Sequence, residues 1–325
     1  MSSVLGIDTS CYTTSIALMD LNNNFLADER IILPVKDGDC GLRQSEMVFL
    51  HNKNLPVLFE KIYDVIKNAP IKAIGVSVCP RPIENSYMPA FTVGQSFAKV
   101  ISIANNLPIY ELSHQENHIL AGMWATDISK TGKFLVGHLS GGTTEFLEVE
   151  SFFDKQNGID LKIKLLGGSK DIQAGQLIDR VGVKLGLPFP AGIHLEKLAF
   201  DNVGLDKQIP VSTDGFNLSF SGPETFIKKL IDKGVSKEKI ATSTQFIIAQ
   251  SLSQVLKNMI KETDINDILL VGGVSSNKFI RGYVSDYLCN CFKEKSVRLH
   301  IPEAKYSPDN AVGALYYAKE KYSSI

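Results

Sequence analysis

The sequence predicts an α/β protein built from two duplicated lobes, each with a mixed sheet. Apolar strands alternate with helical stretches along the chain, and a hairpin with a hydroxyl-rich turn occurs near the start and again near residue 140. The 325 residues suffice for about two domains of ~150 residues each. Alternating strands and helices favour sheets covered by helices on both faces.

The first half of the chain opens with that hairpin. Short apolar strands at 4–8 and 16–19 flank the polar turn 9–14. A strand at 25–33, a helical stretch around 47–66, a buried strand at 73–78 and a helix at 92–105 follow.

The second half repeats this order. Strands at 134–137 and 146–149 flank the turn 140–144, which aligns Ser10, Thr13 and Thr14 with Ser140, Thr143 and Thr144. The remaining predicted elements are a strand at 161–166, helices at 173–185 and 242–263, a buried strand at 268–271, a helix from about 275 and a terminal helix at about 308–321, with Pro308 near its start.

This repeated layout is similar to that of the actin-like ATPases (the ASKHA, ribonuclease H-like fold), in which two duplicated lobes close on a nucleotide. We therefore predict a first lobe at 1–130 and a second at 131–325, with the terminal helix 308–322 packing back on the first lobe. The alternative is two unrelated α/β domains that each happen to carry a hairpin.

Composition and charge exclude several classes of protein. With 44% hydrophobic and 21% charged residues, the chain is unlike disordered, collagenous or coiled-coil proteins. The formal net charge of -1 gives no overall attraction to nucleic acid or anionic membrane, so a polyanion must be bound by a local patch. There is neither a window of ~18 apolar residues nor a signal-peptide pattern, and we expect a cytoplasmic protein without a membrane partner.

The cysteines form an odd, scattered set without a CxxC pair: Cys11, Cys40, Cys79, Cys289 and Cys291. This argues against a disulfide framework and against a cysteine zinc site. Cys289 and Cys291 are interpreted as small buried or helix-end residues.

Two glycine turns are candidates for binding a shared ligand. In the turn from Ser140 to Thr144, Gly141 and Gly142 let backbone N–H groups approach an anion, although Gly-Gly is also a common hairpin dipeptide. The second turn, at 272–277, follows a buried strand, where α/β folds hold nucleotides. Asn277 could contact ribose or phosphate; alternatively, the turn only provides a helix N-cap at Ser275 or Ser276.

A histidine pair predicts a metal site. His114 and His118 are spaced i and i+4, which places both imidazoles on one helical face. The HExxH order of metallopeptidases is absent. Asp309 is a candidate third ligand, or else a helix-capping residue.

Three further residues are candidates for substrate contact. Asp8, beside the first turn, could hold a metal-bound water or a substrate group, or only stabilise its turn. Asp179 lies on an apolar helix edge, where a carboxylate needs a partner such as a ribose hydroxyl. Gly192 permits a close backbone approach.

Across nearly its whole length the chain resembles the catalytic subunits of the tRNA threonylcarbamoyl-adenosine synthases, historically filed as O-sialoglycoprotein endopeptidases (peptidase family M22). Family motifs occur here in the family's order. They lie at 6–14, 114–121, 139–144, 177–187, 190–192, 218–222, 272–277 and 308–311.

The resemblance implies where ligands bind. The implied metal ligands are His114, His118 and Asp309, holding one divalent iron or zinc ion. An adenine nucleotide or threonylcarbamoyl-adenylate would contact His138, Leu139, Ser140, Gly141, Gly142, Asp179, Gly192 and Asn277.

The implied activity is metal-dependent transfer of the threonylcarbamoyl group from its adenylate to N6 of adenosine 37 in tRNA. The metal would act as a Lewis acid, and the glycine N–H groups would stabilise developing charge. The implied partners are tRNA, bound weakly by this chain alone, a smaller paralogous actin-like protein and an ATPase.

Departures from the family motifs predict a diverged paralogue. Tyr12 and Thr13 stand where the family has an acidic pair, Thr143 replaces a histidine, Gln176 replaces a glutamate, and 80–85 replaces a glycine-rich stretch. The alternatives are therefore a nucleotide-binding regulator or partner of the synthase, or carbamoyl transfer to another acceptor. Metallopeptidase activity is disfavoured.

Overall fold

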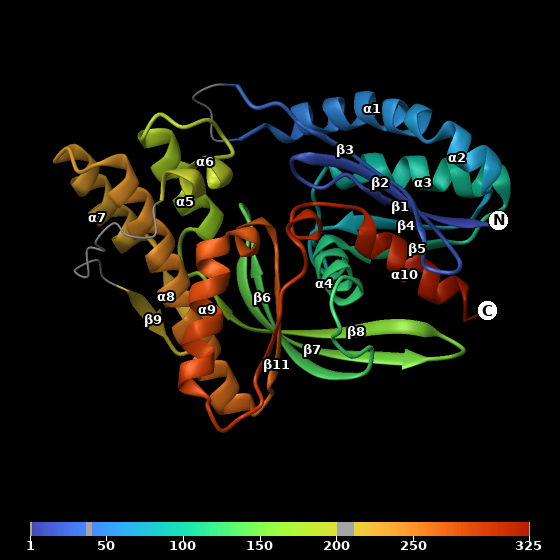
Figure 1. Ribbon diagram of the computed structural model, residues 1–325. Coiled ribbons are helices and arrows are strands. Elements are labelled where there is room, and N and C mark those ends of the chain that lie inside the picture. The colour runs from blue at the N-terminus through green and yellow to red at the C-terminus, as the bar shows by residue number, and fades with distance from the viewer. Residues whose placement is uncertain (1, 37–40, 200–210, 325) are drawn as a thin grey trace.

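The computed structural model describes residues 2–36, 41–199 and 211–324. Its first lobe contains a five-stranded mixed sheet in the order β3-β2-β1-β4-β5 (Figure 1). The predicted hairpin forms the antiparallel pair β1–β2, while β4 and β5 run parallel to β1. The strands are β1 (Ser3–Asp8), β2 (Thr13–Asp20), β3 (Phe25–Ile32), β4 (Ile71–Cys79) and β5 (Ile109–Ser113).

The second lobe repeats this topology. Its sheet has the order β12-β11-β6-β7-β8, so that β6 and β7 form the central hairpin and β11 lies parallel to β6. The predicted duplication is thus present in both the strand order and the strand directions. The strands are β6 (Gly132–Leu139), β7 (Thr144–Asp154), β8 (Gly158–Gly168), β11 (Asp267–Val271) and β12 (Arg298–His300), and a small hairpin adds β9 (Ser212–Asp214) and β10 (Asn217–Ser219).

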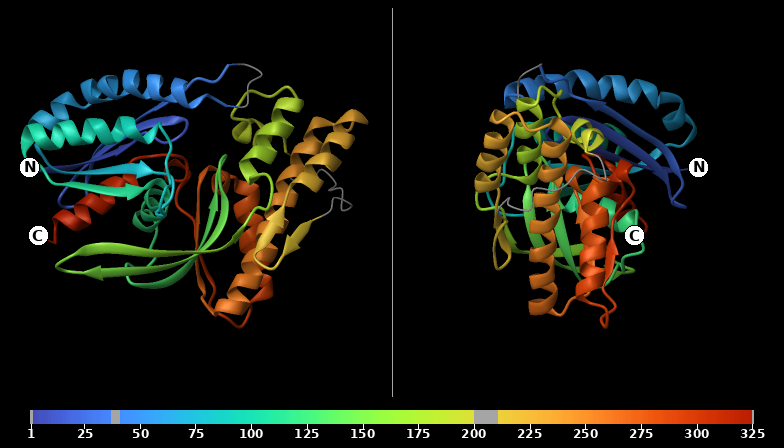
Figure 2. Two further views of the ribbon diagram at one scale, coloured as in Figure 1. Left: turned by 180° about the vertical axis from the view of Figure 1, so that it is seen from behind. Right: turned by 60° about the vertical axis from the view of Figure 1, so that its left-hand side comes forward.

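Helices cover the outer faces of both sheets, as Figures 1 and 2 show. In the first lobe Leu55 and Leu58 pack against Leu5 and Ile7. In the second lobe the long helix α8 contributes Leu252 to the main core. The outer helices are α1 (Gln44–Lys61), α2 (Tyr63–Asn68) and α3 (Phe91–Asn105) in the first lobe, and α5 (Ala174–Lys184), α6 (Gly192–Leu198), α7 (Ser221–Asp232), α8 (Lys237–Thr263) and α9 (Lys278–Cys291) in the second.

Two helices lie between the sheets and position the site: α4 (His114–Trp124) and α10 (Val312–Tyr322). The terminal helix α10 packs on the inner face of the first sheet, against β1 and β4. A side chain at Gly75 would bring its Cβ to 1.9 Å from the Ala314 carbonyl oxygen, so this approach requires glycine. On its other side α10 contributes Ala314 and Tyr316 to a core that includes Phe134 and Leu147 of the second lobe.

Two helix starts differ from the sequence prediction. The terminal helix begins at Val312 rather than at 308, because the side chain of Asn310 folds the preceding loop by donating to the Tyr306 and Pro308 carbonyls. After β11, a 3₁₀ turn (Gly273–Ser276) precedes α9, and Asn277 is the N-cap residue, accepting from the Ile280 N–H. The alternative in which Ser275 or Ser276 caps this helix is therefore wrong.

Smaller predictions have mixed outcomes. The stretch 47–66 is broken at Ile62 into α1 and α2. Cys289 and Cys291 lie at the end of α9, as one interpretation had it, but both are exposed rather than buried; Cys40 lies outside the described residues. Within the described part of the chain, no helix combines the length and apolar character needed to cross a membrane.

Candidate metal centre and adjoining cavity

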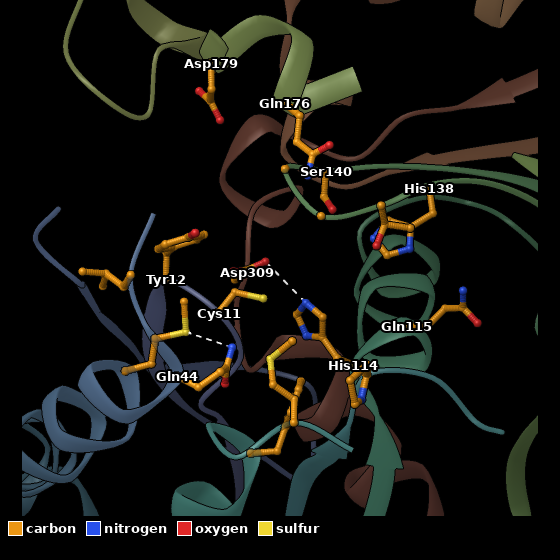
Figure 3. Close-up of a pocket in the computed structure, with 18 of the residues that line it drawn as sticks. Cys11, Tyr12, Gln44, His114, Gln115, His138, Ser140, Gln176, Asp179 and Asp309 are labelled. Atoms are coloured by element: carbon orange, nitrogen blue, oxygen red, sulfur yellow. Dashed lines mark hydrogen bonds and ion pairs between the residues drawn. The ribbon is translucent and has the colours of Figure 1, made fainter. Parts of the chain in front are cut away.

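A cavity of about 550 Å³ lies between the lobes, with walls from both (Figure 3). Such a volume is typical of small-molecule sites. The polar residues lining it include Gln44, Arg81, His114, Gln115 and Asp309 on the side of the first lobe and α10, and His138, Ser140, Thr143, Gln176, Asp179 and Arg180 from the second lobe.

The three predicted metal ligands converge beside this cavity. His114 and His118 lie one turn apart on α4, and Asp309 comes from the loop before α10. The two imidazole Nε2 atoms are 3.1 Å apart, and Asp309 Oδ1 is 3.4 Å from each. Donor atoms this close together fit a single ion with bonds of about 2.0–2.2 Å, and two histidines with one carboxylate are an established zinc or iron donor set.

Local hydrogen bonds fix the backbone that carries these ligands. A capping box starts α4: the Ser113 hydroxyl accepts from the Glu116 N–H at 3.2 Å, and Glu116 accepts from the Ser113 N–H at 2.7 Å. Asn117 ties α4 to the Asp309 loop, since its side-chain amide donates to the Asn310 carbonyl and accepts from the Ala314 N–H. This role of Asn117 was not predicted, although the residue stands between the two histidines in the sequence.

The carboxylate of Asp8 orients His114. Asp8 is completely buried, and its Oδ1 lies 3.3 Å from His114 Nδ1 while its Oδ2 accepts from the Ser10 hydroxyl. A carboxylate on Nδ1 leaves Nε2 directed at a metal. The structure thus gives Asp8 a contact with a predicted ligand, a contact that sequence analysis did not foresee.

Charges around the three ligands set their protonation in the metal-free protein. Burial lowers the pKa of His114, but the carboxylates of Asp8 and Asp309 outweigh it and raise that pKa to about 10. Burial, followed by the neighbouring His114 charge, lowers the pKa of His118. For Asp309, burial acts to raise the pKa, but its bonds to the two histidines hold it well below the usual range. A bound cation would replace the proton that His114 carries.

His138 extends this row of imidazoles into the second lobe. Its ring centroid is 4.8 Å from that of His118, and it is 3% exposed. Neither ring nitrogen has a hydrogen-bond partner among the described residues, and burial holds its pKa well below the ordinary value. A neutral, buried imidazole that lines a cavity is suited to contact a polar ligand.

The first glycine turn also reaches the cavity, next to the start of α5. Gly141 and Gly142 line it with open space where their side chains would be. Gly175 packs so closely that a Cβ there would lie 2.6 Å from the Ser140 carbonyl oxygen. Leu139 instead belongs to the hydrophobic core of the second lobe.

Of the other three residues predicted to contact the nucleotide, one lines the cavity and two do not. Asp179 lines the cavity, accepts from the Ala191 N–H at 2.8 Å, and has its pKa raised by burial. Gly192 opens α6 and Asn277 caps α9; neither lines this cavity. The Asn277 amide also donates to Gln245 at 2.6 Å, and its predicted contact with a nucleotide stays a prediction.

Three of the four single-residue departures from the family motifs line the cavity, and so does the start of the stretch 80–85. Tyr12 lies edge-on to Phe189 across the cavity, with ring centroids 5.8 Å apart. Gln176 accepts from the Gln173 N–H in a capping box at the start of α5, and Thr143 lies at the glycine turn. The departures therefore change the surface that a ligand would contact.

Solved structures share this fold at low sequence identity. Component A of the (R)-2-hydroxyglutaryl-CoA dehydratase from Acidaminococcus fermentans is 15% identical, with a TM-score of 0.55 and coverage of 100% of both chains. A ROK family glucokinase from Streptomyces griseus is 11% identical, with a TM-score of 0.52 and coverage of 98% and 99%. These similarities confirm the predicted actin-like ATPase fold.

Curated relatives are closer in sequence. A protein from Thermosipho melanesiensis is 30% identical over 323 residues, covering 95% of this chain and 91% of its own, and one from Thermus thermophilus is 29% identical over 317 residues, covering 94% and 89%. Both are named tRNA N6-adenosine threonylcarbamoyltransferase. The family model with the same description matches residues 50–315. The chain thus belongs to the tRNA N6-adenosine threonylcarbamoyltransferase family.

Proposed function

We propose that this chain transfers a threonylcarbamoyl group from threonylcarbamoyl-adenylate to N6 of adenosine 37 in tRNA, with one divalent iron or zinc ion bound by His114, His118 and Asp309. The observation that carries the proposal is the convergence of these three donor atoms beside a cavity that also contains the glycine turn. A reaction on tRNA would place the protein in the cytoplasm.

In this reaction the adenosine N6 attacks the carbamoyl carbon and loses a proton, and the bond from that carbon to the phosphate oxygen breaks, releasing AMP. A bound divalent ion would supply Lewis-acid polarisation at the reacting group. The open turn at Gly141 and Gly142 would receive the phosphate through backbone N–H groups, and Asp179 would accept from the ribose hydroxyls.

The chain's own side chains prepare this site before substrate arrives. Asp8 holds a proton on His114 Nδ1, which leaves Nε2 as the metal donor. Tyr12 and Phe189 face each other from opposite lobes and would reduce the access of water to a reactive anhydride.

The second candidate is a nucleotide-binding regulator or partner of the synthase without transfer activity. Its specific support is that Tyr12, Thr13 and Thr143 replace ionisable residues of the family motifs. A third candidate, carbamoyl transfer to another acceptor, retains the same cavity. Metallopeptidase activity stays disfavoured, because the sequence has no HExxH motif.

The decisive experiment measures incorporation of labelled threonine into unmodified tRNA by metal-loaded protein supplied with threonylcarbamoyl-adenylate. It is run with and without the smaller actin-like and ATPase partners that we propose. Modification that is lost in His118→Ala and kept in His194→Ala, a histidine outside the cavity, supports transfer. Binding of ADP without modification under every condition favours the regulator.

A further inference from the structure

Arg81 is a cavity residue for which the proposed reaction has so far no role. It belongs to the stretch 80–85, which replaces a glycine-rich family motif. Among the described residues that line the cavity, Arg81 and Arg180 are the only lysines or arginines. Both side chains are 43% exposed, so both retain contact with solvent in the cavity.

Neighbouring groups hold Arg81 in place. Its Nη2 lies 2.5 Å from Glu145 Oε1, and the other oxygen of Glu145 accepts from the Gln115 side chain at 2.7 Å. The backbone is fixed as well, because the Arg81 N–H donates to the Ser86 hydroxyl and the Pro80 carbonyl accepts from the Gln115 N–H. An arginine held in this way loses little conformational entropy when it binds a ligand.

The guanidinium lies on the histidine side of the cavity. Gln115 directly follows His114, and Glu145 is the β7 partner of His138 on β6. The Arg81 charge contributes to the lowered pKa of His138. Figure 3 shows Gln115 and His138 on one side of the cavity, and Asp179 with Gln176 on another. A ligand with its ribose at Asp179 and its reacting group at the three metal ligands would extend its far end toward Arg81.

We propose that Arg81, held by Glu145 and Gln115, binds the carboxylate at the amino-acid end of the carbamoyl substrate and selects carboxylate-bearing carbamoyl groups over unsubstituted ones. The inference rests on the proposed function and specifies its substrate class. A guanidinium has five N–H donors, and the contact with Glu145 uses one nitrogen. The remaining donors suffice for a paired contact with a carboxylate, the geometry for which arginine is best suited.

Calorimetry with two matched probes tests this role. The first is a non-hydrolysable analogue of threonylcarbamoyl-adenylate, and the second is the same molecule with the threonine carboxylate converted to a carboxamide. The wild-type metal-loaded protein should prefer the carboxylate probe by about 10- to 100-fold, as expected for charge-assisted hydrogen bonds. Arg81→Met should remove this preference while binding the carboxamide probe as well as the wild type does.

Two further variants separate charge recognition from side effects. Glu145 would remain negative in Arg81→Met and would itself repel a carboxylate, so the preference is also measured in Arg81→Met/Glu145→Gln, where it should remain absent. Arg180→Met is the matched control, because Arg180 lines the same cavity with the same exposure and is paired with Glu224. It should change the affinity for both probes by the same factor and leave their ratio unaltered. Melting temperatures report on folding.

The outcomes distinguish this inference from the proposed function. If the wild type binds both probes but Arg81→Met weakens them equally, or changes neither, Arg81 does not recognise the carboxylate and the inference fails alone. If Arg81→Met weakens binding of AMP as much as that of the carboxylate probe, Arg81 binds the phosphate instead. If the wild type binds AMP and neither probe, the proposed function fails and this inference fails with it.

Discussion

A methyl group added at Gly75 should disturb the proposed metal centre, although Gly75 lies on β4 and is not itself part of the site. In the Gly75→Ala variant, the new Cβ would be 1.9 Å from the Ala314 carbonyl oxygen and 2.6 Å from its carbon. Carbon atoms do not approach backbone that closely, so α10 and the sheet must separate by about 1 Å or more. The Asp309 loop leads directly into α10, and this shift would move Asp309 away from the two histidines.

Two quantities should change together. Overpacking of this kind costs about 1–3 kcal/mol of folding stability. A glycine-to-alanine change also stabilises a protein by about 0.4–1 kcal/mol, because it lowers the conformational entropy of the unfolded chain, but this gain is the smaller of the two effects. A displacement of about 1 Å in a binding constellation costs on the order of 100-fold in function. We therefore expect a lower free energy of unfolding and a large loss of zinc or iron affinity, measured by denaturant titration and by competition with a coloured chelator.

Gly282→Ala is the matched control, since Gly282 lies within α9 and has open space around it. Alanine there should stabilise the protein by about 0.5–1 kcal/mol through helix propensity and leave metal affinity unchanged. If Gly75→Ala retains both wild-type stability and metal affinity, the close packing of α10 on β4 does not position Asp309.

Three further expectations follow from charge and protonation. Metal affinity, measured by chelator competition, should fall about tenfold per pH unit below the His114 pKa of about 10, because His114 must lose a proton before it binds the ion. In the Asp8→Asn variant the His114 pKa is lower, so the pH dependence should extend only up to a lower pH. Burial lowers the pKa of His51 from 6.5 to about 4. Between these two pH values the unfolded chain binds a proton at His51 that the folded chain does not bind. The free energy of unfolding should therefore decline by up to about 3 kcal/mol as the pH falls from 6.5 toward 4. Denaturation of His51→Gln should lack this decline. With a formal net charge of -1, the isolated chain should bind tRNA weakly and lose affinity steeply with added salt; tight binding at physiological salt in a filter assay would contradict this.

Features that depend on local spacing could be predicted from the sequence. His114 and His118 share a helical face because they are four residues apart, and the hairpin around Ser10 could be matched with the one around Ser140. The alternation of strands and helices also indicated mixed sheets with helices on both faces.

Contacts between distant residues could not be predicted in this way. The bond from Asp8 to His114 joins positions 106 apart, and no periodicity reports it. Pro308 resembled a helix start, but Asn310 binds the carbonyls and the Val312 N–H around the loop and delays the helix. Arg81 appeared only as a departure from a motif, and its pairing with Glu145 depends on how the two lobes meet.

The position of α10 in the sequence also determines when the proposed site can assemble during synthesis. The strands of the first lobe are complete by Ser113, yet Asp309, the proposed third metal ligand, and the helix α10 that covers their inner face come much later in the sequence. Asp309 is made about 190 residues after His118, which at about 5–20 residues per second means a wait of about 10–40 s. During this interval the apolar side chains of the inner face, among them Val4, Ala17 and Ala73, lack the cover that α10 later provides. A nascent chain that stopped before Asp309 would lack one of the three proposed metal ligands.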